Sequence, residues 1–141
     1  MTFFCSEKIS EEDYVLISDG QGNGCSASVG KQGGKQYIWL SKDSNAEKNC
    51  FTAKKILHEF IHTFGFHHEH LRPDRDEYIK IKTENIKDYN AHNKILFDVM
   101  GDASTFNVDY DGNSIMHYTS GYMSKKNGMD TMVSKVGLLQ F

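Results

Sequence analysis

The sequence has few of the features that mark a disordered, membrane-spanning or nucleic-acid-binding chain. It contains one proline, which argues against a disordered linker, and no run of about 18 or more apolar residues that could form a transmembrane helix. Its 16 basic and 19 acidic residues form no long block of either sign, so neither nucleic acid nor an acidic membrane is indicated as a partner. The length of 141 residues and the hydrophobic content of 38% predict a single globular domain.

The first residues also lack the basic flank and sustained apolar stretch of a signal peptide. Taken literally, this indicates a cytosolic protein; the alternative is that a targeting segment lies outside the given sequence. Cysteine is scarce as well. Cys5, Cys25 and Cys50 cannot all pair within one chain, so at least one thiol is free or pairs elsewhere. None of them has metal-ligand spacing to another, so a cysteine-based metal site is not indicated.

Histidine, in contrast, is concentrated in residues 58–69, which read His-Glu-Phe-Ile-His-Thr-Phe-Gly-Phe-His-His-Glu. His58 and His62 are four residues apart, which places them on one face of a helix, where both can bind one metal ion. Gly65 can take the left-handed conformation that ends a helix, and the resulting turn can carry His68 to the metal as a third ligand. Three nitrogen ligands leave one position of a tetrahedral Zn²⁺ open for water, and Glu59 is then the candidate general base.

A bare pair of histidines at this spacing is a weak signal. The alternative is the histidine-rich end of an amphipathic helix that binds no metal. The extension through Gly65 and His68 favours the zinc site, because each added residue has its own mechanical role.

Strands are predicted at residues 13–18, 26–30 and 35–40 from their β-branched and aromatic residues. The glycine-rich residues 19–24 predict a tight reversal after the first strand. The strand at 35–40 is expected to leave one edge exposed, where an extended peptide can add a further strand.

A helix is predicted to begin near Phe51, with Thr52 as its N-cap. Apolar residues recur along it at helical spacing and predict a buried face made of Phe51, Ile56, Leu57, Phe60, Ile61 and Phe64. Further along, the pattern favours a short exposed strand within 78–86, a helix within 87–99 and a strand at 131–133. The second helix would place Ile95, Leu96 and Val99 on its apolar side.

Charged residues follow the histidine segment from Arg72 to Glu77. One interpretation is a solvated turn; the other is a salt-bridge network that fixes the loop beneath the third metal ligand. The residues alone favour the solvated turn.

A second motif, Ser-Ile-Met-His-Tyr at residues 114–118, completes a resemblance. Together with the histidine segment through Glu69, the Arg-Pro-Asp-Arg-Asp run at 72–76 and Tyr78, it resembles the astacin family of zinc endopeptidases, within the metzincins. The resemblance extends from about residue 13 to residue 133. It implies an α+β, zincin-like fold: a small mixed sheet with an active-site helix, an irregular C-terminal subdomain and a cleft between them. The implied single catalytic domain, 1–141, divides into subdomains of about 1–65 and 66–141.

The resemblance also implies roles for particular residues. Met116 would form a hydrophobic floor beneath the zinc, and Tyr118 would be an additional, movable metal ligand and catalytic residue. Cys25 and Cys50 would form a disulfide, which implies a secreted or extracellular protein. The substrate, a protein or peptide, would pair with the strand that holds Tyr37 and Trp39. Lys135 would lie near the pocket for the residue after the cleaved bond, although a solvated lysine is the simpler interpretation.

The sequence departs from the family pattern at both ends. Met1 begins too late for the N-terminus to reach Glu69, no cysteine follows Cys50, and the residues after Lys135 do not follow the pattern of the family's closing helix. We therefore expect a catalytic domain truncated at both ends, in which Glu69 lacks its usual partner. The rival hypothesis is a non-catalytic zinc-binding module or an inactive fragment of such a peptidase.

Overall fold

The computed structural model describes residues 2–4, 11–20, 24–45 and 48–137, and Cys5 lies outside these ranges. The chain forms two compact units, Met1–Phe66 and His67–Phe141. Both helices and strands are present, and the predicted α+β class is confirmed. Among the described residues, no helix has the length and apolar character needed to cross a membrane.

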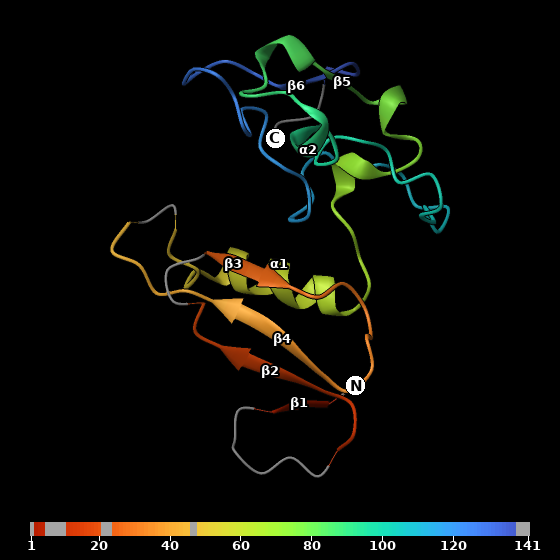
Figure 1. Ribbon diagram of the computed structural model, residues 1–141. Coiled ribbons are helices and arrows are strands. Elements are labelled where there is room, and N and C mark those ends of the chain that lie inside the picture. Colours follow the sequence, from red (N-terminus) through yellow and green to blue (C-terminus); the bar gives the residue numbers. More distant parts are fainter. Residues whose placement is uncertain (1, 5–10, 21–23, 46–47, 138–141) are drawn as a thin grey trace. The chain divides into compact units, whose positions relative to one another are not determined.

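The first unit is a mixed sheet packed against one helix. Its strands lie in the order β1 (Thr2–Phe4), β2 (Tyr14–Ser18), β4 (Lys35–Leu40) and β3 (Cys25–Ala27), as Figure 1 shows. β2 is parallel to β1 and β4, whereas β3 is antiparallel to β4. β2 and β4 lie close to the predicted strands at 13–18 and 35–40, whereas β3 begins and ends earlier than the predicted strand at 26–30, and β1 was not predicted.

One prediction about this sheet is wrong, and another is confirmed. β4 lies between β2 and β3, so it is not an edge strand; β3 forms that edge of the sheet. The chain does reverse direction between β2 and β3, as predicted, because β2 is parallel and β3 antiparallel to the same strand, β4. Strand order depends on pairing between distant segments, which the local pattern of residues does not reveal.

The core of the first unit lies between the sheet and helix α1 (Ala53–Thr63). Ile56 and Phe60 of the helix pack against it, as predicted. The core itself comprises Val15, Ile38, Leu40 and the Cys25–Cys50 disulfide. The disulfide confirms the pairing that the family resemblance implied, and it ties the edge strand β3 to the segment just before α1.

The predicted apolar face of this helix is too wide. Phe51, Leu57 and Phe64 are 56%, 55% and 62% exposed, so these side chains do not belong to the core. Helical spacing alone does not show how wide a stripe the sheet can cover, because the sheet contacts only the residues that point directly toward it.

The second unit is mostly irregular, as predicted, and has a two-stranded antiparallel sheet of β5 (Ile79–Ile81) and β6 (Met132–Ser134). Short 3₁₀ turns occupy Glu69–Leu71, Arg75–Glu77 and Thr83–Asn85. Its core contains five buried side chains: Ile79, Ile86, Phe97, Tyr110 and Met132.

Two predictions for this unit need correction. The expected helix within 87–99 is reduced to one turn, α2 (Ala91–Lys94), after which Ile95 and Val99 are exposed and Phe97 is the buried residue. The strand β5 is not exposed on both sides, because Ile79 is fully buried. One turn of helix cannot align three apolar side chains on one face, so Phe97 reaches the core from the irregular segment beyond it.

Candidate metal centre

The helix that carries the first two histidines begins at a well-formed cap. Thr52 has an extended backbone conformation, and its hydroxyl accepts a hydrogen bond from the backbone N–H of Lys55 at 3.3 Å. This satisfies one of the free N–H groups of the first turn and confirms the predicted N-cap. From this start, His58, Glu59 and His62 fall in the last two turns of α1.

The same helix ends just before the glycine that the sequence suggested. Gly65 has a φ of +99°, in the region that favours glycine, and its N–H donates to the His62 carbonyl at 2.9 Å. The N–H of Gly30 donates to that carbonyl at 2.8 Å. The His62 carbonyl in the last turn therefore accepts hydrogen bonds from two backbone N–H groups, and the chain continues from the end of the helix to His68.

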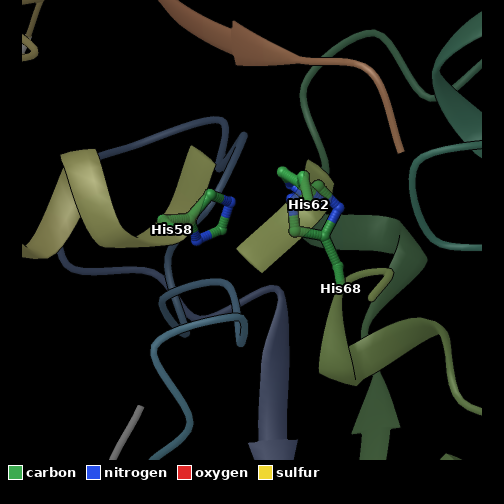
Figure 2. A group of neighbouring side chains, drawn as sticks. All are labelled: His58, His62 and His68. Carbon is green, nitrogen blue, oxygen red and sulfur yellow. The ribbon is translucent and has the colours of Figure 1, made fainter. Parts of the chain in front are cut away.

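The three histidines form the metal-binding group. Their potential ligand nitrogens all lie within 4.8 Å of one another (Figure 2). The Nδ1 atom of His62 lies 2.8 Å from the carbonyl oxygen of Phe66, which can only accept, so Nδ1 carries the proton and Nε2 keeps its lone pair for a metal. This donor set suits tetrahedral zinc, and His58, His62 and His68 can hold a Zn²⁺ ion.

Glu59 lies beside the first histidine in a buried position. The residue is 6% exposed, and burial raises the pKa of its carboxyl group to about 7. A carboxylate with a pKa near neutrality can both accept and return a proton under ordinary conditions.

The segment that contains Met116 is a tight turn tied to the third histidine. The N–H of Met116 donates to the hydroxyl of Ser114 at 3.1 Å, and its carbonyl accepts from the N–H of Glu69 at 3.1 Å. Met116 is 4% exposed. The backbone of Glu69, the residue after His68, is thus hydrogen-bonded to that of Met116. That Met116 forms a floor beneath a metal stays a prediction.

Tyr118, at the end of that turn, lies among aromatic rings. Its ring centroid is 4.3 Å from that of His68, 4.2 Å from that of His70 and 4.0 Å from that of Tyr122. His70 was not among the residues predicted from the sequence. The sequence does place His70 two residues after His68. Spacing alone, however, does not indicate that His70 is fully buried and His68 is not.

Two further buried groups support this turn. The Tyr110 hydroxyl lies 2.6 Å from Nε2 of His117, whose Nδ1 lies 2.6 Å from the carbonyl oxygen of Tyr118. Because that carbonyl can only accept, His117 donates through Nδ1 and accepts from Tyr110. Burial lowers the pKa of His117 and raises that of Tyr110, so both are neutral at pH 7.

The charged run after the site is a network and not a solvated turn. The side chain of Arg72 is only 13% exposed and pairs with both Glu69 and Asp74. Within this network Oε1 of Glu69 accepts from Arg72 and, at 2.9 Å, from the N–H of Asp111. That Glu69 lacks the N-terminus, its usual partner in the family, stays a prediction.

The residues assigned to substrate contact have the following places. Tyr37 and Trp39 of β4 stack with ring centroids 4.5 Å apart, and Trp39 is 38% exposed. Lys135 is exposed, and its ammonium donates to the Asp76 carbonyl at 2.5 Å. Their contact with substrate stays a prediction, and β4 offers no free edge to support it.

The fold is of the α+β class and the three histidines can hold one zinc ion. Comparison with known proteins identifies the family. The family model for Astacin, a peptidase family, matches residues 2–140. The chain belongs to this family, which confirms the resemblance.

Two nematode proteins are among the relatives. The chain is 35% identical to zinc metalloproteinase nas-5 of Caenorhabditis elegans, covering 89% of this chain and 34% of that protein. It is 39% identical to zinc metalloproteinase nas-8 of the same organism, covering 89% and 28%. The chain thus spans about a third of the length of these relatives.

Solved structures agree with this assignment. High choriolytic enzyme 1, a hatching enzyme zinc-protease of the medaka fish Oryzias latipes, matches with a TM-score of 0.79 and 30% identity, over 92% of this chain and 60% of that one. Myroilysin matches with a TM-score of 0.53 and 19% identity, over 89% and 66%, which supports the fold alone.

Proposed function

We propose that residues 1–141 form one catalytic domain of a zinc-dependent endopeptidase that hydrolyses protein or peptide substrates. The observation that carries this proposal is the group of three histidine nitrogens within 4.8 Å of one another, two of them on the helix that also holds the buried Glu59. The names of the relatives, which are zinc metalloproteinases and a hatching enzyme, support it.

The chain's own residues would divide the chemistry as follows. Zinc, when bound to the three histidines, lowers the pKa of a bound water to about 7 and polarises the scissile carbonyl. Glu59 takes the proton of the attacking water and later gives it to the leaving amine. It cannot serve as a ligand together with His58, its immediate neighbour on the helix, so its carboxylate is free for proton transfer.

Tyr118 and Met116 complete the proposed site. Tyr118 would be a further, movable ligand of the ion, and its hydroxyl would donate a hydrogen bond to the developing negative charge on the substrate. Loss of one such donor lowers kcat by roughly 10²–10³-fold in other hydrolases. Met116 packs beneath the histidines. Tyr37, Trp39 and Lys135 are proposed to contact the substrate, with Lys135 favouring an acidic side chain after the cleaved bond.

We further propose that the protein acts outside the cell or in a secretory compartment. The disulfide between Cys25 and Cys50 supports this location, because such bonds persist in oxidising environments.

The test compares cleavage of an unfolded protein by the zinc-loaded chain with and without a chelator. Cleavage that the chelator stops, and that added zinc restores, supports the proposal. Glu59→Gln keeps the side chain's shape but removes the proton acceptor, so it should bind zinc with unchanged stoichiometry and lose turnover. Glu77→Ala removes an exposed carboxylate and should leave turnover unchanged. Zinc bound without cleavage by the unaltered chain would instead support a non-catalytic module.

A further inference from the structure

We propose that His70 is a positioning residue for Tyr118: its ring is a fixed flat surface that sets the orientation of the Tyr118 phenol beside His68. The inference rests on the proposed function only for the catalytic role of Tyr118. The placement of the two rings is a separate matter and can be tested without any activity.

His70 is held at both its ring and its backbone. The residue is fully buried, and its Nε2 lies 2.9 Å from the Leu96 carbonyl oxygen. A carbonyl only accepts, so Nε2 carries the proton and donates. The Arg75 guanidinium, through Nη1, donates to the His70 carbonyl at 2.9 Å. The imidazole therefore cannot rotate without breaking a buried hydrogen bond.

The contact between the two rings has the geometry of stacking. The rings of His70 and Tyr118 have centroids 4.2 Å apart and planes inclined by 28°. The χ2 torsion of a tyrosine is broad, so the plane of its ring is set largely by what packs against its faces. The fixed imidazole limits that torsion and so determines how the phenol is presented next to His68, whose ring centroid is 4.3 Å from that of Tyr118.

The hydrogen bonding of His70 does not account for its whole ring. Its Nδ1 is buried and has no hydrogen-bond partner among the residues that the structure describes. A residue needed only to satisfy the Leu96 carbonyl would not require this second nitrogen, whose burial is unfavourable. The half of the ring that bears Nδ1 instead provides an aromatic surface on which the Tyr118 ring stacks.

Two substitutions separate the roles of hydrogen bond and ring. His70→Gln can keep a donor to Leu96 but has no flat ring, whereas His70→Phe keeps the ring and loses the donor. Positioning by stacking predicts that the Gln variant loses about tenfold in kcat with zinc still bound, and that the Phe variant stays within about threefold. In a Tyr118→Phe background the Gln substitution should cause little further loss, because the group it positions is already gone. Where the Gln variant does not fold, His70→Leu takes its place.

A second readout does not depend on catalysis. Tyrosine ring-flip rates are measured by NMR on the full chain labelled at its tyrosine rings, and the Tyr118 signal is assigned by its loss in Tyr118→Phe. The Tyr118 ring should flip about tenfold faster in the His70→Gln or His70→Leu variant than in the unaltered chain. In the His70→Phe variant its flip rate should not rise. Two results would overturn the proposal. One is an equal flip rate of the Tyr118 ring in all variants. The other is a kcat that His70→Gln retains and His70→Phe loses. An inactive chain that still shows these flip rates would refute the peptidase and leave the positioning intact.

Discussion

The guanidinium of Arg72 lies 3.0 Å from the carboxylate of Glu69, measured from Nη1 to Oε1, and Glu69 directly follows the third histidine of the metal centre. The same guanidinium donates to both oxygens of Asp74, through Nε at 3.0 Å and Nη2 at 2.8 Å. It also donates to the carbonyls of Val108 and Asp109, at 2.8 and 3.3 Å. An arginine has five N–H groups, and here each has an acceptor. Arg72 therefore ties the histidine segment to a loop that is distant in sequence.

This network predicts that lysine cannot replace Arg72. An ammonium has a single centre and cannot reach two carboxylates and two carbonyls at once, so Arg72→Lys and Arg72→Met should both lower the free energy of unfolding by about 2 kcal/mol or more. Denaturant unfolding of the metal-free chain measures this loss. Lys125→Met, at a site where the ammonium donates to one exposed carbonyl, is the control and should cost far less. Full stability in the Arg72→Lys variant would show that charge alone suffices.

The pairing of Arg72 also makes stability depend on acid. Its hydrogen bonds to Asp74 hold the pKa of that carboxyl below its ordinary value of 3.8. The stabilising contribution is therefore fully present above the unfolded value and is lost as the pH falls from there through the lower folded value. Asp74→Asn should cost about 1 kcal/mol at neutral pH and progressively less below pH about 4.

Unfolding curves at several pH values test this dependence. The exposed Asp102→Asn serves as the comparison and should follow the unaltered chain. If the free energies of unfolding of Asp74→Asn and the unaltered chain differed by the same amount throughout the acid range, the predicted pH dependence would be wrong.

The parts of the site that sequence analysis predicted depend on local spacing. The N-cap at Thr52, the shared face of His58 and His62, and the turn at Gly65 all lie within one helix and its ends, where residues a few positions apart determine the geometry. The position of β4 between two strands was missed, because sheet order is set by pairing of segments that are distant in sequence.

The charged run at 72–77 and the buried His70 were also missed because their partners are distant in sequence. The acceptors of Arg72 include carbonyls 36 and 37 residues further along the chain, so a cluster of charges read locally resembled a solvated turn. The ring of the buried His70 is hydrogen-bonded to the carbonyl of Leu96, which is 26 residues away. Hydrogen-bond partners at such separations follow from the fold, and no periodic pattern encodes them.

The disulfide should contribute to the stability of the first unit. Cys25 and Cys50 are 25 residues apart, and closing a loop of that size restricts the unfolded chain enough to stabilise the folded state by about 3 kcal/mol. A Cys25→Ala/Cys50→Ala variant should lose this amount in denaturant unfolding. The unaltered chain in a reductant should lose a similar amount, whereas the variant should not respond to the reductant. A reductant effect of equal size in both proteins would mean that the loss arises elsewhere.

The turn after the helix offers the most direct link between backbone conformation and metal binding. Gly65 has a φ of +99°, and a Cβ placed there would come no closer than 3.8 Å to Gly30. Space is therefore available, and the cost of Gly65→Ala would come from the backbone conformation, at about 1–2 kcal/mol. Because this turn leads the chain from His62 to His68, the same variant should bind zinc more weakly.

A matched pair of variants isolates this backbone effect. Gly101→Ala places a Cβ in open space at a residue without positive φ, so it should change stability by less than about 0.5 kcal/mol and leave zinc affinity unchanged. Gly65→Asn should fall between the two alanine variants, because asparagine tolerates the left-handed region better than alanine does. Competition with a chromogenic chelator measures the zinc affinity of each variant. If Gly65→Ala bound zinc as tightly as Gly101→Ala, the conformation of the turn would not be what brings His68 to the other two histidines.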